Sequence, residues 1–208
     1  MNYNIFIQES IINILIIYIQ YNKHILNNKK GDIKTMQTDQ VNLYIYPNQI
    51  LKTKCEEVTK INSDIELLIT QMFNVMRRLK GIGISAPQIG SNKRICIVES
   101  NPSISYVLIN PVITEASGIK EGDEGCLSFP NIRVNIKRPT HIKVEALNVN
   151  GELKTYEVDN EVARIFCHEI DHIEGILMID HLSNLKKDVV KRKMNKLERR
   201  FKERYLKR

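Results

Sequence analysis

Apolar side chains recur at helical spacing in a stretch that begins after Asn62. They are Ile65, Leu68, Ile69, Met72, Phe73, Met76 and Leu79. Asn62 or Ser63 can accept hydrogen bonds from the free N–H groups of a first turn, and Gly81 is typical of the position after a last turn. The pattern therefore predicts an amphipathic helix whose methionine and phenylalanine stripe packs into a core.

The segment after this helix, residues 81–90, is rich in glycine and cannot continue the helix. Its sequence, GIGISAPQIG, contains Gly-x-Gly without the rest of a dinucleotide-binding fingerprint, and it follows a helix rather than a strand. Nucleotide binding is therefore disfavoured. We expect an irregular loop in which the backbone approaches another group closely, with a plain turn as the alternative.

Strand patterns fill the middle of the chain. Two short β runs are predicted over residues 94–99 and 106–109, bounded by Pro102 and Pro111. A β-hairpin is predicted over residues 140–158, because apolar and polar side chains alternate on both sides of a central Asn-Gly pair. These runs are short and consecutive, so antiparallel pairing is expected.

A second helix is predicted from Asp159 or Asn160, either of which can cap it, to about Glu174. The order of elements is helix, several strands, helix, without a repeating strand-helix-strand rhythm. This order predicts an α+β domain in which antiparallel sheets pack around the second helix. At 208 residues, with 42% apolar and 26% charged residues, the chain suits one ordinary globular domain, which we place at residues 36–185.

The positive charge of the chain is concentrated at its end. Residues 186–208 hold twelve Lys or Arg and three acidic residues, so they carry +9 and leave about −2 for the rest of a chain whose net charge is +7. Apolar residues recur among these charges at helical spacing, namely Val190, Met194, Leu197, Phe201 and Tyr205. The pattern predicts a basic amphipathic C-terminal helix that can meet a polyanion.

Residues 1–35 form a leader of uncertain status. Its apolar run, Ile11–Ile19, is shorter than the roughly 20 residues that span a bilayer, so no membrane segment is expected. It has no Arg and no small-residue cleavage site, which disfavours transit and secretory signals, and Met36 is an alternative start. Four cysteines without paired spacing indicate reduced thiols. We expect a cytoplasmic protein, or an organellar one if the leader is a transit peptide.

The pentapeptide HEIDH, residues 168–172, lies on the second predicted helix. Residues four apart share a helix face, so His168 and His172 can direct ring nitrogens toward one metal ion. Glu169 can reach a water molecule there without being a ligand, which is the general-base position of the His-Glu-x-x-His motif. Two surface histidines beside ordinary acids are the alternative interpretation of an isolated motif.

A third protein ligand is expected elsewhere, because catalytic metal sites usually have three protein ligands and one open position. A metzincin would have its third histidine at position 178, which is Met178, and His181 fits neither that spacing nor that helix face. Cys126 is the best candidate, since a thiolate binds transition metals well and Gly125 allows close approach. Taken alone, a cysteine is more often a small buried apolar residue.

Three segments occur in an order that resembles the three signature motifs of peptide deformylases. They are GIGISAPQ at residues 81–88, EGCLS at 124–128 and HEIDH at 168–172, and the resemblance extends over residues 43–185. It implies hydrolytic removal of the N-terminal formyl group from formyl-methionine of nascent polypeptides, with release of formate. A nascent formylated polypeptide is then the expected partner.

The resemblance also implies the roles of the metal site. Cys126, His168 and His172 match the metal ligands of the family, and Glu169 matches its general acid/base. One divalent ion is expected, Fe(II) first, with Zn, Ni or Co as alternatives.

Further matches imply how the substrate is held. The side-chain amide of Gln88 and the backbone N–H of Leu127 match the two donors to the formyl oxygen. Ile82 and Gly83 match positions that line the pocket for the methionine side chain. Ser85 stands where the family commonly has alanine, a small change that we expect to be tolerated.

Two further expectations concern residues next to the expected metal ligands. Glu124 and Arg138 are hypothesised to form an ion pair that fixes the loop of Cys126. Cys167 stands where glutamine is common and lies about 100° around the helix from His168, so we expect it to pack rather than to bind metal.

Alternatives remain for the enzyme and for the tail. A zincin-type peptidase would need only the HEIDH motif, and a basic ribosome- or RNA-binding relative would need no catalysis. The tail at residues 186–208 is interpreted as a ribosome-docking helix or as a solvated helix packed on the body. A monomer is expected.

Overall fold

The computed structural model describes residues 41–101 and 103–205, and the leader at residues 1–35 lies outside this part of the chain. The elements in chain order are η1 (Gln49–Lys52), α2 (Ser63–Arg78), β1 (Gly83–Ser85), η2 (Ala86–Ile89), β2 (Ile95–Asn101), β3 (Ile104–Ser117), β4 (Lys120–Cys126), β5 (Phe129–Arg138), β6 (His141–Leu147), β7 (Leu153–Asp159), α3 (Asn160–Ile173), η3 (Met178–His181) and α4 (Asn184–Tyr205).

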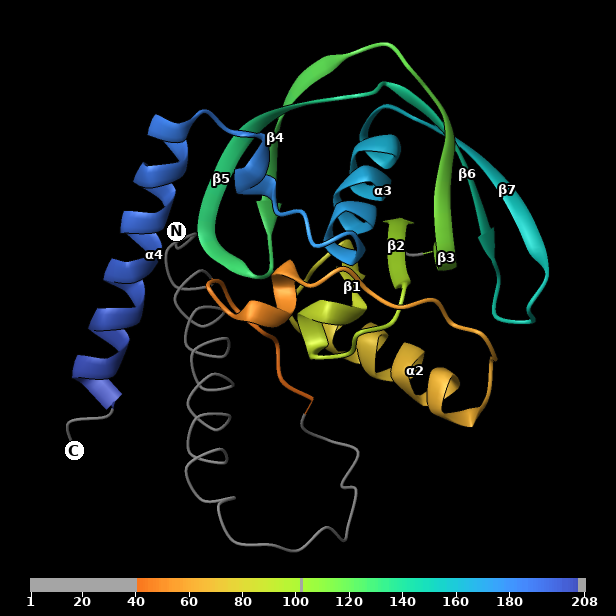
Figure 1. The fold of residues 1–208 in the computed structure, drawn as a ribbon, viewed down its shortest axis with the longest axis horizontal. Helices are drawn as coiled ribbons and strands as arrows, with labels where there is room; N and C mark the ends of the chain where they lie inside the picture. The colour runs from red at the N-terminus through yellow and green to blue at the C-terminus, as the bar shows by residue number, and fades with distance from the viewer. Residues whose placement is uncertain (1–40, 102, 206–208) are drawn as a thin grey trace, which may run out of the picture.

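Two antiparallel sheets surround helix α3, which confirms the predicted α+β class. One sheet has the strand order β1-β2-β3-β6-β7, and the other consists of β4 and β5. Helix α3 contacts β1 and β2 of the first sheet and β5 of the second, so it lies between the two (Figure 1). Side chains on its opposite faces therefore reach both sheets.

Three apolar clusters fill the interior. The first packs α2 against β1 and β2, and the second packs α3 against the other face of the large sheet. The third joins η1, β5, η3 and α4, with buried residues Tyr46, Leu51, Phe129, Ile132, Ile136, Leu177, Met178, Ile179, Val190 and Met194. The clusters hold α3 from several sides, which fixes the helix that carries the HEIDH motif.

Both predicted helices form, with one difference at a cap. The Asn62 side chain accepts a hydrogen bond from the Ile65 N–H at 3.2 Å, as its position before α2 predicts. Asp159 is the N-cap residue of α3, as one of the two predicted positions, but its side chain makes no capping bond and instead lies 2.9 Å from His141 Nδ1. Gly175 ends α3 with φ +76°, and a Cβ there would lie 2.6 Å from the Lys52 carbonyl oxygen.

The glycine-rich segment at residues 81–90 is more regular than the sequence indicates. Gly83–Ser85 pair with β2 as a strand, and Ala86–Ile89 form a 3-10 helix, so the prediction of an irregular loop is wrong there. The hydrogen-bond partners come from β2, and no local pattern in three residues reveals them.

Pro111 does not end a strand as predicted, because β3 runs through it. The register shifts between Ile109 and Val112, and Asn110 has φ +54°. A β-bulge accommodates the missing N–H of proline inside a strand. The predicted hairpin at residues 140–158 forms as β6 and β7, with Gly151 at φ +78° in the turn.

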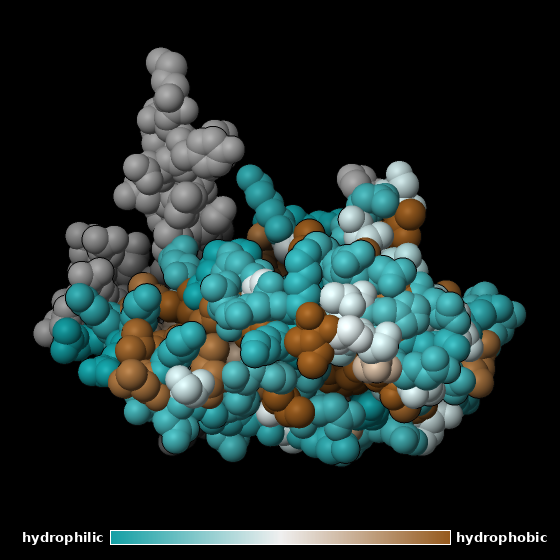
Figure 2. All heavy atoms as spheres, turned by 90° about the horizontal axis from the view of Figure 1, so that it is seen from above, coloured by the Kyte–Doolittle hydropathy of each residue, from teal (hydrophilic) through white to brown (hydrophobic). Residues whose placement is uncertain are grey.

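The C-terminal helix α4 lies along β5 on the outside of the small sheet (Figure 1). Val190 and Met194 are buried and Leu197 is half-buried in the third cluster, so the apolar stripe packs on the body. The side chains of Phe201 and Tyr205 lie outside the described part. None of the described helices is long and apolar enough to cross a membrane. The face seen in Figure 2 is mostly hydrophilic, with apolar side chains in small separate groups.

We expect Ile97→Ala to lower the free energy of unfolding by about 2–5 kcal/mol, because truncation of a fully buried side chain leaves a cavity. Leu153→Ala is the control: this β7 side chain is 65% exposed, and the free energy should change by less than about 0.5 kcal/mol. Urea unfolding followed by circular dichroism measures both. Equal losses for the two variants would contradict the placement of the core.

Candidate active site

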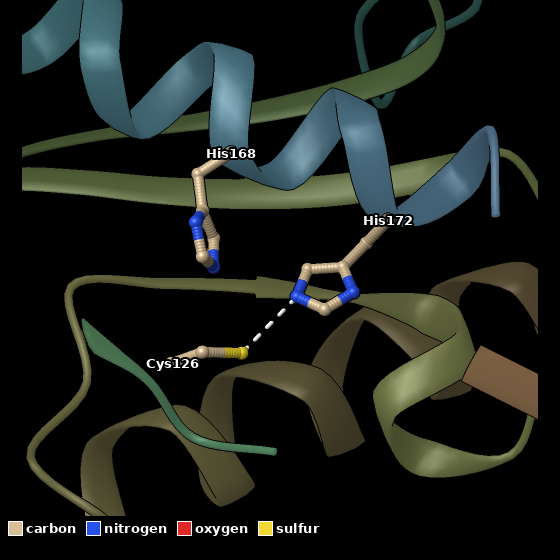
Figure 3. A group of neighbouring side chains, drawn as sticks. All are labelled: Cys126, His168 and His172. Carbon is tan, nitrogen blue, oxygen red and sulfur yellow. Dashed lines mark hydrogen bonds between the residues drawn. The ribbon is translucent and has the colours of Figure 1, made fainter. Parts of the chain in front are cut away.

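Cys126, His168 and His172 converge at the junction of the small sheet and helix α3. The two histidines lie one helical turn apart on α3, and Cys126 is the last residue of β4 (Figure 3). Cys126 Sγ lies 3.2 Å from His172 Nε2, and the three ligand atoms all lie within 4.8 Å of one another. No other group of three His, Cys, Asp or Glu side chains converges in this way within residues 41–101 and 103–205.

This donor set fits a single divalent ion. Metal–nitrogen and metal–sulfur bonds of about 2.0–2.3 Å place two tetrahedral ligand atoms roughly 3.5 Å apart. Burial first, and then the charges of His168 and Arg138, lower the pKa of His172 well below its usual range. His172 is therefore neutral, which is the form that donates a lone pair to a metal.

The carboxylate of Glu124 orients His168. Its Oε2 lies 3.0 Å from His168 Nδ1, so Nδ1 donates to this carboxylate and the ring is oriented with Nε2 toward the other two ligand atoms, where a metal ion would take the place of the second proton. Arg138 donates to both carboxylate oxygens at 2.9 and 3.1 Å, and Arg164 donates to Oε1 at 2.9 Å. Although burial opposes ionisation, the hydrogen bonds from His168 and Arg138 hold the pKa of Glu124 at about 2. The hypothesised Glu124–Arg138 pair is confirmed.

The Arg164 guanidinium also connects α3 to the main chain of the β4–β5 hairpin. It donates to the carbonyl oxygens of Lys120 at 2.9 Å and Ile136 at 3.0 Å. A Cβ on Gly122 would lie 2.6 Å from Arg164 Nη2, so the close approach of the guanidinium requires a glycine there. The strand that ends in Cys126 is thus held at a set distance from the helix of the histidines.

Glu169 is buried beside the ligands with few polar neighbours. Burial raises its pKa, and the charge of His168 and a hydrogen bond from Ser85 oppose the increase. Ser85 Oγ donates to Glu169 Oε2 at 2.5 Å. A Cβ on Gly83 would lie 2.4 Å from Glu169 Oε1, so strand β1 passes directly against this carboxylate.

Gln88 directs its amide toward the metal-ligand cluster. Its Oε1 accepts the Ser85 N–H at 2.9 Å, while its Nε2 lies 3.5 Å from Cys126 Sγ and 3.2 Å from Ser128 Oγ. Leu127 follows Cys126 directly in the turn between β4 and β5. The two residues matched to the formyl-oxygen donors therefore flank the same cysteine.

The residues matched to the methionine pocket lie at the start of β1. Ile82 is 59% exposed, and the Gly83 beside it is buried against Glu169. Strand β1 is at the edge of the large sheet. The side chain of Ile82 is thus exposed to solvent at a sheet edge, directly before the glycine that contacts Glu169.

Several contacts at this site were not predicted from the sequence. Arg164 lies four residues before His168, and this helical spacing could have indicated that both reach Glu124. The bond of Ser128 to Gln88 and that of Ser85 to Glu169 had no local signal.

Cys167 packs in the second cluster as predicted, and burial raises the pKa of its thiol to about 11, so it stays protonated.

An α+β fold with a Cys-His-His donor set and a buried glutamate beside it defines a metal-dependent hydrolase. Residues 40–188 match the sequence model of the polypeptide deformylase family, and the chain belongs to this family. It is therefore an enzyme that removes the formyl group from nascent polypeptides and depends on a metal ion.

Relatives and solved structures agree with this assignment. The chain is 41% identical over 160 residues to a peptide deformylase of Acidobacterium capsulatum, covering 74% of this chain and 93% of that protein. It is 32% identical over 200 residues to the chloroplastic peptide deformylase 1B of Solanum lycopersicum, covering 91% and 72%. A Legionella pneumophila peptide deformylase structure superposes with a TM-score of 0.73 at 32% identity, covering 76% of this chain and 95% of that one. A Plasmodium falciparum structure gives 0.71 at 34% identity, covering 79% and 99%.

We expect Arg138→Ala to weaken metal binding by about 10- to 100-fold, because it removes two hydrogen bonds from the carboxylate that orients His168. Lys137→Ala, at the exposed neighbouring position of β5, is the matched control and should leave the affinity unchanged. Competition with a chromophoric chelator measures the dissociation constants. Equal affinities of the Arg138 variant and the wild type would exclude this role for the ion pair.

Proposed function

We propose that this chain hydrolyses formyl-methionyl polypeptides at one divalent ion held by Cys126, His168 and His172, with Glu169 as the group that moves protons. The observation that supports this most directly is the convergence of three donor atoms within 4.8 Å beside a buried glutamate. A peptidase of the zincin type would have no use for a cysteine among the ligands.

The ion would polarise the formyl oxygen and lower the pKa of the attacking water. We propose Fe(II) as the native metal, and one thiolate with two imidazoles suits Zn, Ni and Co as well. Cys126, His168 and His172 would supply three ligands, and a catalytic site of this kind keeps a further position for water or substrate.

Glu169 takes the proton of the attacking water and delivers it to the departing amine. Its burial supports this role, because a raised pKa allows a carboxylate to hold a proton between the two transfers. Gly83 supports it sterically, since only a residue without a side chain leaves room for Glu169 Oε1.

Negative charge that develops on the formyl oxygen is stabilised by the Gln88 amide and the Leu127 N–H. One preorganised donor of this kind typically contributes about 2.7–4 kcal/mol. The orientation of Gln88 supports the proposal: its oxygen is engaged by the Ser85 N–H, so its amide nitrogen faces the Cys126 side.

The methionine side chain of the substrate packs against Ile82 and Gly83. The exposed Ile82 side chain and the position of β1 at a sheet edge support this placement. An extended peptide can add to an unpaired strand edge through main-chain hydrogen bonds, which tolerates different residues after the methionine.

We expect Glu169→Gln to lower kcat for formate release from formyl-Met-Ala-Ser by about 10²- to 10⁴-fold while the variant keeps one metal ion per chain. The amide retains the shape of the side chain but cannot accept the proton. Formate release is measured with and without chelator, and metal content by elemental analysis. Undiminished turnover would refute the role of Glu169. Cleavage of peptide bonds in unformylated substrates would favour the peptidase alternative.

We further propose that the enzyme is a monomer and that α4 docks it on the ribosome through ribosomal RNA. Its apolar stripe packs on the body, while the basic residues Arg192, Lys193 and Lys196 are exposed. The +9 charge of residues 186–208 suits a phosphate backbone. Because ribosomes are the proposed partner, we place the protein in the cytoplasm or in an organelle that has its own ribosomes. The tomato relative is named as a chloroplastic protein.

We expect the triple change Arg192→Glu, Lys193→Glu and Lys196→Glu to reduce cosedimentation with purified ribosomes by at least about tenfold at low salt, because three phosphate contacts are replaced by repulsion. Formate release from a free tripeptide should not change. Reversal of the exposed Lys60, Lys137 and Lys154 is the charge-matched control. Equal loss of binding in both triple variants would contradict docking through α4.

A further inference from the structure

Ser85 is a fully buried hydroxyl that contacts Glu169 at two atoms. Ser85 Oγ lies 2.5 Å from the carboxylate oxygen Oε2 and 3.0 Å from the main-chain oxygen of the same residue. Among the described residues it is the one side chain that donates a hydrogen bond to the Glu169 carboxylate. Because a hydrogen bond is stronger where water is excluded, the two contacts together fix the rotamer of Glu169 relative to its own backbone.

The backbone of Ser85 holds the second polar group of the site. Its N–H donates to Gln88 Oε1 at 2.9 Å, which leaves Gln88 Nε2 3.5 Å from Cys126 Sγ. One residue of β1 therefore contacts both the proposed acid/base and the proposed oxyanion donor. Ser85 thus links these two groups through its hydroxyl and its N–H.

The pairing of β1 explains how Ser85 reaches this position. Ser85 pairs with Cys96 and Gly83 pairs with Val98, so the two β1 residues lie on the same face of the strand. That face meets Glu169: Gly83 leaves room for one carboxylate oxygen, and Ser85 donates to the other. Ile84 points to the opposite face and packs in the first cluster with α2.

We propose that Ser85 is a positioning residue for deformylation, whose hydroxyl orients the Glu169 carboxylate and whose N–H orients the Gln88 amide. This rests on the roles proposed above for Glu169 and Gln88. It replaces the expectation that serine in place of the common alanine is a neutral change. In this chain the hydroxyl is part of the arrangement that makes Glu169 point toward the attacking water.

We expect Ser85→Ala to lower kcat by about 10- to 100-fold, in the range for groups that orient catalytic residues, with KM changed by less than about twofold. Metal content and metal affinity, measured by chelator competition, should equal those of the wild type. Ile97→Val is the stability control, because it removes a buried methyl group from the adjacent strand β2. It should lower Tm by about as much as Ser85→Ala does, without changing kcat.

A second background separates positioning from general loosening of the fold. Glu169→Asp withdraws the carboxylate by one methylene from Ser85 Oγ, so the hydrogen bond is already lost in that variant. Adding Ser85→Ala to Glu169→Asp should then cost less than about twofold in kcat, whereas independent effects multiply. Formate release at saturating formyl-Met-Ala-Ser measures all four proteins.

The proposal is overturned if Ser85→Ala keeps wild-type kcat, or if it costs the same factor in both backgrounds. It is also overturned if the loss of activity follows a loss of metal. These outcomes leave the proposed function intact, provided that Glu169→Asp and Glu169→Gln are impaired. Full activity of both Glu169 variants would instead refute the proposed function itself.

Discussion

The buried carboxylate of Glu124 joins the two parts of the molecule that carry the metal ligands. It accepts hydrogen bonds from Arg138 on β5 and from Arg164 and His168 on α3. A buried charge is tolerated only when it is paired and fully hydrogen-bonded, so these partners hold one another in place. Because Cys126 lies two residues further along β4, the same carboxylate sets where the sulfur meets the histidines.

Helix α3 serves the core and the site at once. Its apolar face packs on the large sheet through residues such as Phe166 and Ile170. His168 and His172 point toward Cys126 (Figure 3), and Glu169 meets Ser85 on the edge strand β1. The apolar burial that stabilises the fold therefore also orients the chemical groups.

Much of the fold could be predicted from local patterns in the sequence. The Asn62 cap, the hairpin at residues 140–158 and the amphipathic tail follow from spacing over a few residues. The HEIDH motif and the resemblance of three segments to one family predicted Cys126, His168 and His172 as ligands, and the structure brings these three side chains together. The two predictions that failed concern β1 and Pro111. Strand β1 is too short to show a period, and Pro111 lies at a register shift in the pairing of β3 with β6.

Residue types at helical or strand spacing are enough to infer the class of fold, the histidine pair and the chemistry available. Which distant groups meet depends on how the elements pack: Arg164 contacts the β4–β5 hairpin, and Ser85 contacts Glu169 across 84 positions of chain. The physical reason is that helix periodicity acts through the chain's own geometry. Hydrogen bonds between separate elements exist only after packing has excluded water and brought their atoms within about 3 Å.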